Sequence, residues 1–340
     1  MSKKPKHILV IRLSAMGDVA MTVPVLKALT TQYPEVKLTV LTKTLFTPFF
    51  RNLPNTQVVV ADIKNQHKGI YGLWKLSREL KTLQFDAVAD LHNVLRSNIL
   101  NSFFFGKQVV QINKGREEKK ALTNGTSFKQ LKTNHQRYAD VFESLGYPID
   151  LSNPIFPKKE NLKQQFLTVI GTNAKPWIGV APFAAFEGKM YPLDLMETVI
   201  KELSKEHKVL LFGAKNEEQV TLEKIATQFE NVINLAGQFT LEEELDIISN
   251  LDLMLAMDSG NAHMAAMLGI KVVTVWGITH PYAGFLPFGH TMDSAILADH
   301  SQFPKIPTSV YGNKMPEGYE NAIRSISPST IISKIKTTLK

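Results

Sequence analysis

Three loops carry side chains whose types could do chemistry, and each follows an apolar segment of strand length. The first, Ser-Ala-Met-Gly-Asp at residues 14–18, brings Gly17 and Asp18 to the start of a predicted helix. Gly17 lets the backbone approach a ligand closely. A carboxylate at this position either caps the helix or is a catalytic carboxylate. The position alone leaves both interpretations open.

The second loop, residues 257–269, joins a buried strand to a short helix rich in alanine. Its candidate ligand-binding residues are Asp258, Ser259, Gly260, Asn261 and His263. Small residues allow close approach, and the free N–H groups at a helix start suit a diphosphate. The alternative is an ordinary strand–turn–helix in which Asp258 is the cap and the histidine is structural.

The third loop, residues 181–192, places Lys189 after the flexible Gly188 and before a helix that starts near Pro192. A lysine here could reach an anionic phosphate as a mobile point charge. The alternative is a solvated surface lysine.

Weaker candidates follow other predicted strands. They are Glu217 and Glu218 as partners for ribose hydroxyls, His92, Asn93 and Arg96 at the end of the fourth strand, and Trp276 and Tyr282 for stacking on a base. Acidic residues are favoured in any first helical turn, and the two aromatic rings could equally pack inside the protein.

The elements that must position these loops alternate between strands and helices. Aliphatic runs at residues 7–13, 37–42, 57–62 and 85–91 predict parallel strands buried on both faces. The same alternation begins again near residue 175. It predicts an α/β protein with two Rossmann-like, doubly wound domains that face a central cleft. Ligands bind beyond the carboxyl ends of such strands, where these loops lie.

The predicted division is an N-terminal domain at 1–155, a linker region at 156–174, a second domain at 175–325 and a closing helix at 326–340. Within the first domain, residues 113–133 are polar and highly charged, which predicts a long mobile loop.

Composition excludes several classes of protein. The chain has 340 residues, 44% of them hydrophobic, and no cysteine, which excludes disulfides and thiolate metal sites. No apolar run approaches the ~18–20 residues that span a bilayer, and we expect no signal peptide. The net charge of +8 favours an anionic partner, namely nucleic acid, an acidic lipid surface or a phosphorylated substrate. Without an RNA-binding or helix-turn-helix motif, we expect no nucleic-acid partner.

Four stretches in this order resemble glycosyltransferase family 9, the lipopolysaccharide heptosyltransferases of Gram-negative bacteria. They are residues 8–29, 85–97, 189–192 and 251–281, and residues 322–335 resemble the closing segment of the family. The Gly-Asp pair and the Asp-Ser-Gly-x-x-His pattern are specific in combination.

The resemblance implies a GT-B fold, with an N-terminal acceptor domain and a C-terminal nucleotide-sugar domain. It implies inverting transfer of a heptose-like sugar from an ADP-activated donor to a lipopolysaccharide core or lipid A-type acceptor. Asp18 would be the general base and Lys189 would contact the donor phosphates. The loop with Asp258, Ser259, Gly260 and His263 would hold the diphosphate and sugar. On the acceptor side the candidates are Gly17, His92, Asn93 and Arg96. We expect no cofactor and no dedicated metal site, because lysine and amide groups can stabilise the leaving diphosphate.

One departure from the family is Ala184 and Ala185, where members commonly carry hydroxyl residues before the lysine. It motivates a catalytically silent nucleotide-sugar-binding protein as an alternative, and a sugar-nucleotide epimerase is a second one. The basic residues of segment 114–132 could meet acceptor phosphates or the anionic inner leaflet, or form a solvated insertion. The resemblance implies a cytoplasmic enzyme with peripheral contact at the inner membrane.

Overall fold

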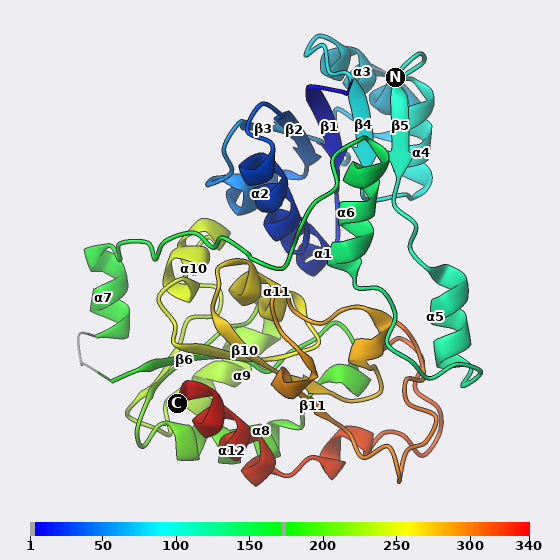
Figure 1. The fold of residues 1–340 in the computed structure, drawn as a ribbon. Coiled ribbons are helices and arrows are strands. Elements are labelled where there is room, and N and C mark those ends of the chain that lie inside the picture. Colours follow the sequence, from blue (N-terminus) through cyan, green and yellow to red (C-terminus); the bar gives the residue numbers. More distant parts are fainter. Residues whose placement is uncertain (1–3, 172–174) are drawn as a thin grey trace. The chain divides into compact units, whose positions relative to one another are not determined.

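Two parallel sheets organise the chain in the computed structural model, which describes residues 4–171 and 175–340 (Figure 1). The chain divides into two compact units. Unit 1 comprises Met1–Lys114 and Asn134–Ile155, and unit 2 comprises Gly115–Thr133 and Phe156–Lys340.

Unit 1 is built on a five-stranded sheet with the strand order β3-β2-β1-β4-β5. The strands are β1 (His7–Ile11), β2 (Lys37–Thr42), β3 (Thr56–Val60), β4 (Ala87–Asp90) and β5 (Gln108–Gln111). Its helices are α1 (Met16–Ala20), α2 (Thr22–Gln32), α3 (Gly69–Lys81), α4 (Leu95–Ser102), α6 (Asn134–Ser144) and the 3₁₀ helix η1 (Thr44–Phe50). The aliphatic side chains of β1 and β4 pack against α3 and α4 in one buried cluster. The alternation of strands and helices in the sequence therefore corresponds, as predicted, to a sheet covered by helices.

Unit 2 is built on a six-stranded sheet with the order β11-β10-β9-β6-β7-β8. The strands are β6 (Trp177–Ala181), β7 (Lys208–Leu211), β8 (Val232–Asn234), β9 (Leu253–Met257), β10 (Lys271–Trp276) and β11 (Ala295–Leu297). Its α-helices are α5 (Arg116–Thr123), α7 (Gln164–Ile170), α8 (Leu193–Leu203), α9 (Glu217–Ala226), α10 (Leu241–Ile248), α11 (Gly260–Met267) and α12 (Pro328–Leu339). Its 3₁₀ helices are η2 (Glu187–Lys189), η3 (Pro281–Ala283), η4 (Met292–Ser294) and η5 (Ala322–Ser325). As Figure 1 shows, α12, in red, ends the chain beside α8.

Two helix starts predicted from the sequence are confirmed. The Thr240 hydroxyl accepts the N–H of Glu243, whose carboxylate accepts the N–H of Thr240 in return, so α10 begins with a capping box. Ser327 caps α12, with Pro328 in the first helical position.

The prediction of a mobile loop at residues 113–133 is wrong. Residues 116–123 form α5, and the segment belongs to unit 2 although its flanks belong to unit 1. Leu122 and Leu131 pack with Ala283, and the Leu131 N–H donates to the Tyr282 carbonyl. The physical reason is that these two leucines, hidden among charged residues, bury apolar surface on unit 2.

Other boundaries also differ from the predicted division. Unit 1 ends at Ile155 but lacks residues 115–133, which the prediction placed in the N-terminal domain. The predicted linker region contains α7, whose Phe166 packs edge-on against Phe239 with ring centroids 5.3 Å apart. Residues 172–174 of that region lie outside the described residues. No helix among the residues that the structure describes is long and apolar enough to cross a membrane.

Candidate functional site

In unit 1, the predicted catalytic carboxylate lies in an ion pair at the start of α1. The Arg12 guanidinium is 2.6 Å from the Asp18 carboxylate and also donates to the Leu91 carbonyl at 2.5 Å. The Ala15 N–H donates to the same carboxylate at 3.3 Å, so Asp18 also secures the helix start. The Asp18 side chain keeps 28% of its surface exposed, against 7% for Arg12. The arginine therefore fixes a carboxylate that a hydroxyl group can still reach.

The loop after β4 is shaped by Asp90, which the sequence reasoning missed. One carboxylate oxygen accepts the N–H groups of His92 and Asn93, and the other accepts the side-chain amides of Asn101 and Gln111. Asp90 is fully buried, so these four donors compensate its desolvation. An acidic residue that ends an apolar strand was the available signal.

The structure brings one acceptor-side candidate, His92, to the first loop. Its Nε2 lies 3.2 Å from the Ser14 hydroxyl, and its buried Nδ1 has no hydrogen-bond partner among the described residues. Burial, followed by the charges of Arg12 and Lys114, lowers the pKa of His92 to about 4. The ring is therefore a neutral hydrogen-bonding group near pH 7.

The other acceptor-side candidates have different surroundings. The Asn93 side chain donates to the Ile112 carbonyl, and Arg96 is exposed on α4. Gly17 lies inside α1, where its carbonyl accepts the Met21 N–H. Asn93 and Gly17 are thus held by hydrogen bonds, whereas Arg96 makes no hydrogen bond or ion pair with the first loop in the described part of the chain.

In unit 2, two of the predicted loops meet through an ion pair. The Lys189 ammonium lies 2.8 Å from the Asp258 carboxylate, and the Thr279 hydroxyl donates to the same oxygen at 2.9 Å. The exposed fractions of the lysine and aspartate side chains are 12% and 8%. The interpretation of Lys189 as a solvated surface residue is therefore wrong. Asp258 does not cap α11 either, since Ser259 is the N-cap.

Close backbone approaches hold Lys189 in place. The Gly188 carbonyl accepts the Ile278 N–H at 3.0 Å, and a Cβ atom on Gly277 would lie only 2.2 Å from that carbonyl oxygen. A Cβ atom on Gly312 would lie 2.4 Å from the Lys189 Cδ. The sequence reasoning missed Gly277 and Gly312 because they lie far from the lysine along the chain.

The start of α11 completes this cluster. The Ser259 hydroxyl is buried, makes no cap hydrogen bond and has no partner among the described residues. Gly260 and Asn261 open the helix, and His263 is buried within it. The first N–H groups of a helix carry partial positive charge and have no carbonyl partner in the helix. Together with an ammonium group and a hydroxyl, they form a set of donors that suits a diphosphate.

The remaining candidates divide between exposed and structural residues. Glu217 is exposed, whereas the Glu218 carboxylate accepts the Ala214 N–H at the start of α9. Trp276 is buried and its indole N–H donates to the Thr274 hydroxyl, so the ring packs inside the protein. Tyr282 packs edge-on against His280. Among the described residues no three histidine, aspartate or glutamate side chains gather as metal ligands would.

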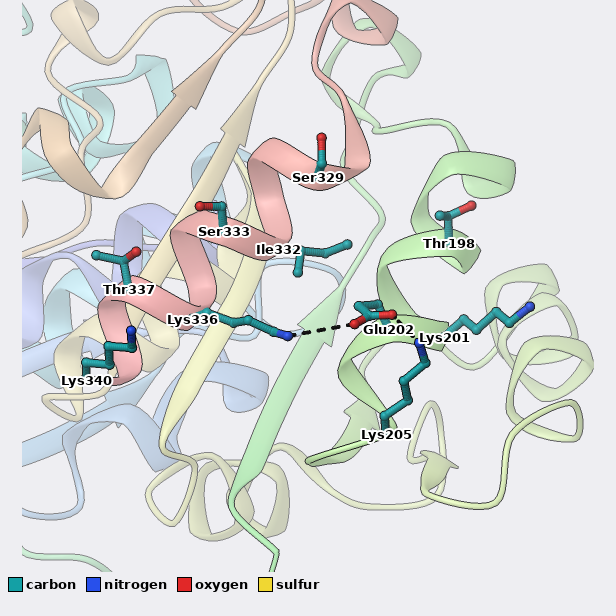
Figure 2. Close-up of a pocket in the computed structure, with 10 residues that line it drawn as sticks. All are labelled: Thr198, Lys201, Glu202, Lys205, Ser329, Ile332, Ser333, Lys336, Thr337 and Lys340. Atoms are coloured by element: carbon teal, nitrogen blue, oxygen red, sulfur yellow. Dashed lines mark hydrogen bonds and ion pairs between the residues drawn. The ribbon is translucent and has the colours of Figure 1, made fainter.

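A separate surface depression lies between α8 and α12 (Figure 2). Its lining includes Lys201, Lys205, Lys336 and Lys340, and Glu202 pairs with two of these lysines at 2.5 and 3.7 Å. None of the predicted site residues lines it.

The fold defines the class of the protein. Two parallel α/β sheets of this kind form the GT-B fold of solved heptosyltransferases. The glycosyl transferase family 9 structure from Veillonella parvula matches with a TM-score of 0.78 and 21% identity, covering 98% of this chain and 97% of that one. The E. coli heptosyltransferase WaaC with ADP matches with a TM-score of 0.69 and 19% identity, covering 98% and 99%.

The family follows from the sequence comparison. The model of glycosyltransferase family 9 (heptosyltransferase) matches residues 73–305, and the chain belongs to this family. It is therefore a glycosyltransferase. Lipopolysaccharide core heptosyltransferase OpsX of Haemophilus influenzae is 24% identical over 299 residues, covering 82% of this chain and 81% of the relative. Lipooligosaccharide heptosyltransferase 2 of the same organism is 26% identical over 357 residues, covering 98% and 99%.

Proposed function

We propose that this enzyme transfers a heptose-like sugar from an ADP-activated donor to a lipopolysaccharide core acceptor, with inversion at the anomeric carbon. The observation that carries the proposal is the cluster of Lys189, Asp258 and Thr279 beside the start of α11. The relatives named as heptosyltransferases, and the related structure solved with ADP, support this donor.

The donor half of the mechanism stabilises a leaving group. When the bond between the anomeric carbon and the diphosphate breaks, negative charge grows on the phosphate oxygens. Lys189 has three N–H donors and uses one on Asp258, so two remain for phosphate. The Ser259 hydroxyl and the first N–H groups of α11 supply further donors. Of the two ribose candidates we favour Glu217, because Glu218 already accepts the Ala214 N–H.

The acceptor half uses Asp18 as general base. Its carboxylate takes the proton of the acceptor hydroxyl while that oxygen forms the new bond to the anomeric carbon. Attack on the face opposite the diphosphate gives inversion. Arg12 holds the carboxylate in one orientation, and the neutral His92 and Ser14 offer hydrogen bonds beside it. A preorganised base of this kind contributes about 10²–10⁴-fold to the rate.

A lipid A-type acceptor would place the reaction at the cytoplasmic face of the inner membrane, as the resemblance implies. Fewer basic residues of segment 114–132 can meet the acceptor or the membrane than the sequence indicated. Lys119 is buried with its ammonium 4.5 Å from the Phe285 ring centroid, so it does not face an acceptor. Lys120 and Lys129 are exposed and keep that role in the proposal.

The silent-protein alternative depends on the two alanines before Lys189. Ala184 packs against the core of unit 2 and Ala185 is exposed. Since both side chains are methyl groups, neither can donate a hydrogen bond to a phosphate. A lost hydrogen bond to a charged group costs about 1.5–3 kcal/mol. The unpaired Ser259 hydroxyl can offset part of this loss.

Calorimetric titration of the full chain with ADP, UDP and GDP tests the donor, followed by transfer from ADP-heptose to lipopolysaccharide core. We expect selective ADP binding and transfer. Selectivity for another nucleotide would replace the donor, and ADP binding without transfer would favour the silent protein. The Lys201→Gln variant is the control for any lysine variant of the cluster, because that lysine lines the depression of Figure 2 instead. It should bind ADP as the wild type does.

A further inference from the structure

The outer face of α3 presents a compact group of large apolar side chains. Ile70, Tyr71 and Trp74 are 66%, 77% and 44% exposed, and the two aromatic rings stack with centroids 5.7 Å apart. Residues three and four apart share one face of a helix, so these three form a single stripe. No other helix in the described part of the chain exposes three large apolar side chains so close together. Clusters of this kind mark interaction sites, whereas single exposed residues do not.

Cations surround this stripe. Lys64, Lys68, Lys75, Arg78 and Lys81 are exposed on α3 and on the loop before it. The segment 62–81 has two carboxylates, and both are engaged. Asp62 accepts N–H groups of Asn65 and Gln66, and Glu79 lies 3.2 Å from the His67 ring. The face is therefore apolar at its centre and positive around it.

The stripe lies on a fixed platform. On the inner face of α3, Leu73, Leu76 and Leu80 are buried in the core of unit 1. The preceding loop packs tightly on the helix, since a Cβ atom on Gly72 would lie 2.4 Å from the backbone of His67. The aromatic rings therefore cannot turn into the core without breaking it.

We propose that this face of α3 docks on an anionic lipid bilayer. Tyrosine and tryptophan rings suit the headgroup region, because one end is apolar and the other forms hydrogen bonds. Lysine and arginine beside them reach lipid phosphates, and their attraction depends on the anionic lipid content. A protein partner would instead need an apolar groove with an acidic rim. This inference rests on the proposed function in one respect, the acceptor at the inner membrane. It assigns a defined surface of the protein to that membrane contact.

Co-sedimentation of the full chain with vesicles tests the docking. We expect binding to phosphatidylcholine vesicles that contain phosphatidylglycerol and much weaker binding to phosphatidylcholine alone. Tyr71→Ser/Trp74→Ser should weaken binding by about tenfold or more, and Lys68→Gln/Lys75→Gln by about tenfold.

Two control variants test whether binding depends on this face of α3 or only on the overall charge and exposed apolar surface of the protein. Lys201→Gln/Lys205→Gln removes two lysines from the depression of Figure 2, and Val220→Ser removes an exposed apolar residue of α9. Both should bind as the wild type does. If they lose as much binding as the α3 variants, or if the α3 variants bind normally, the proposal is overturned.

Tryptophan fluorescence reports the same contact without sedimentation. The chain has three tryptophans, of which Trp276 is buried and Trp177 is partly buried. Anionic vesicles should shift the emission to shorter wavelength, and Trp74→Phe should abolish that shift while the protein still sediments. A shift that persists in Trp74→Phe would contradict insertion of this ring.

Transfer assays keep this inference separate from the proposed function. Tyr71→Ser/Trp74→Ser should act normally on a lipid-free core acceptor and slowly on the same acceptor in anionic vesicles. Equal rates of the variant and the wild type on vesicles would overturn the docking while leaving the transferase intact. Vesicle binding by a wild type that transfers nothing would overturn the proposed function alone.

Discussion

Each unit has a predicted site carboxylate paired with one cation, but the two carboxylates differ in exposure. Asp18 keeps 28% of its side chain exposed beside Arg12, whereas Asp258 keeps 8% beside Lys189. An exposed carboxylate can exchange a proton with a substrate. A buried one is suited to fix a cation, because the pair compensates the desolvation of both charges.

At this scale we predict that Lys189→Met weakens ADP binding by at least about tenfold, since a charge-assisted hydrogen bond is lost. The variant should also unfold more easily, by on the order of 3 kcal/mol, because Asp258 is left buried without its cation. Calorimetry and chemical denaturation measure the two effects.

The double variant Lys189→Met/Asp258→Asn separates them. It should regain most of the stability without regaining ADP affinity. Normal ADP binding by the single variant would remove Lys189 from the donor site.

Sequence reasoning singled out Asp18, Lys189 and Asp258 from their loops but missed the residues that hold them. Arg12 follows a buried strand, and Thr279 lies 21 positions from the aspartate it contacts. The contact of Thr279 with Asp258 is set by which strand ends lie side by side. That order, β9 between β6 and β10, follows from the fold and not from local spacing.

At the scale of elements, the loop at Gly312 packs against the stem of Lys189. This glycine has φ +81 and its α-carbon faces the Lys189 stem, whereas Gly318 has φ +83 with no atom near its missing Cβ. We predict that both Gly→Ala variants lose about 1 kcal/mol of stability from the left-handed backbone. Only Gly312→Ala should also lose ADP affinity, by about tenfold, in a calorimetric titration. Equal ADP affinities of the two variants would show that the loop does not position Lys189.

A second prediction at this scale concerns η3. The His280 ring accepts the Tyr282 N–H, and burial, with a smaller contribution from His300, lowers its pKa to about 4. In the unfolded chain the His280 ring takes up a proton below about pH 6.5. The stability from the neutral ring is therefore present above about pH 6.5 and lost as the pH falls towards 4.

The His280→Asn variant keeps an acceptor for the N–H and removes the titration. We expect its melting temperature to fall less than that of the wild type between about pH 7 and pH 5. Comparing the two proteins cancels other groups, such as Glu244, whose pKa burial raises to about 7. Parallel curves would contradict this account.

Elements with strong periodicity were predictable, and short ones were not. The strands β1 and β9 are buried along their length and β2 is buried after its exposed Lys37, and their positions follow from the pattern alone. β5 reads Gln-Val-Val-Gln with no fully buried residue, and α5 buries only Lys119 and Leu122. Both depend on a neighbouring element, so the local sequence carries little signal of them.

At the scale of the whole molecule, the proposed function divides the chemistry between two α/β units. Asp18 lies in unit 1, and Lys189 and Asp258 lie in unit 2. In this account one unit supplies the base and the other holds the leaving diphosphate. The two functions should therefore fail separately when single residues are changed.

The most direct test measures kcat and donor affinity together for Asp18→Asn. The substitution keeps the size of the side chain and removes the base, so we expect kcat for transfer to fall by about 10²-fold or more with ADP affinity unchanged. Asp62→Asn is the control, because that carboxylate also accepts backbone N–H groups but lies outside the site. Transfer by Asp18→Asn at close to the wild-type rate would contradict the account and leave Asp18 as a residue that only secures the start of α1.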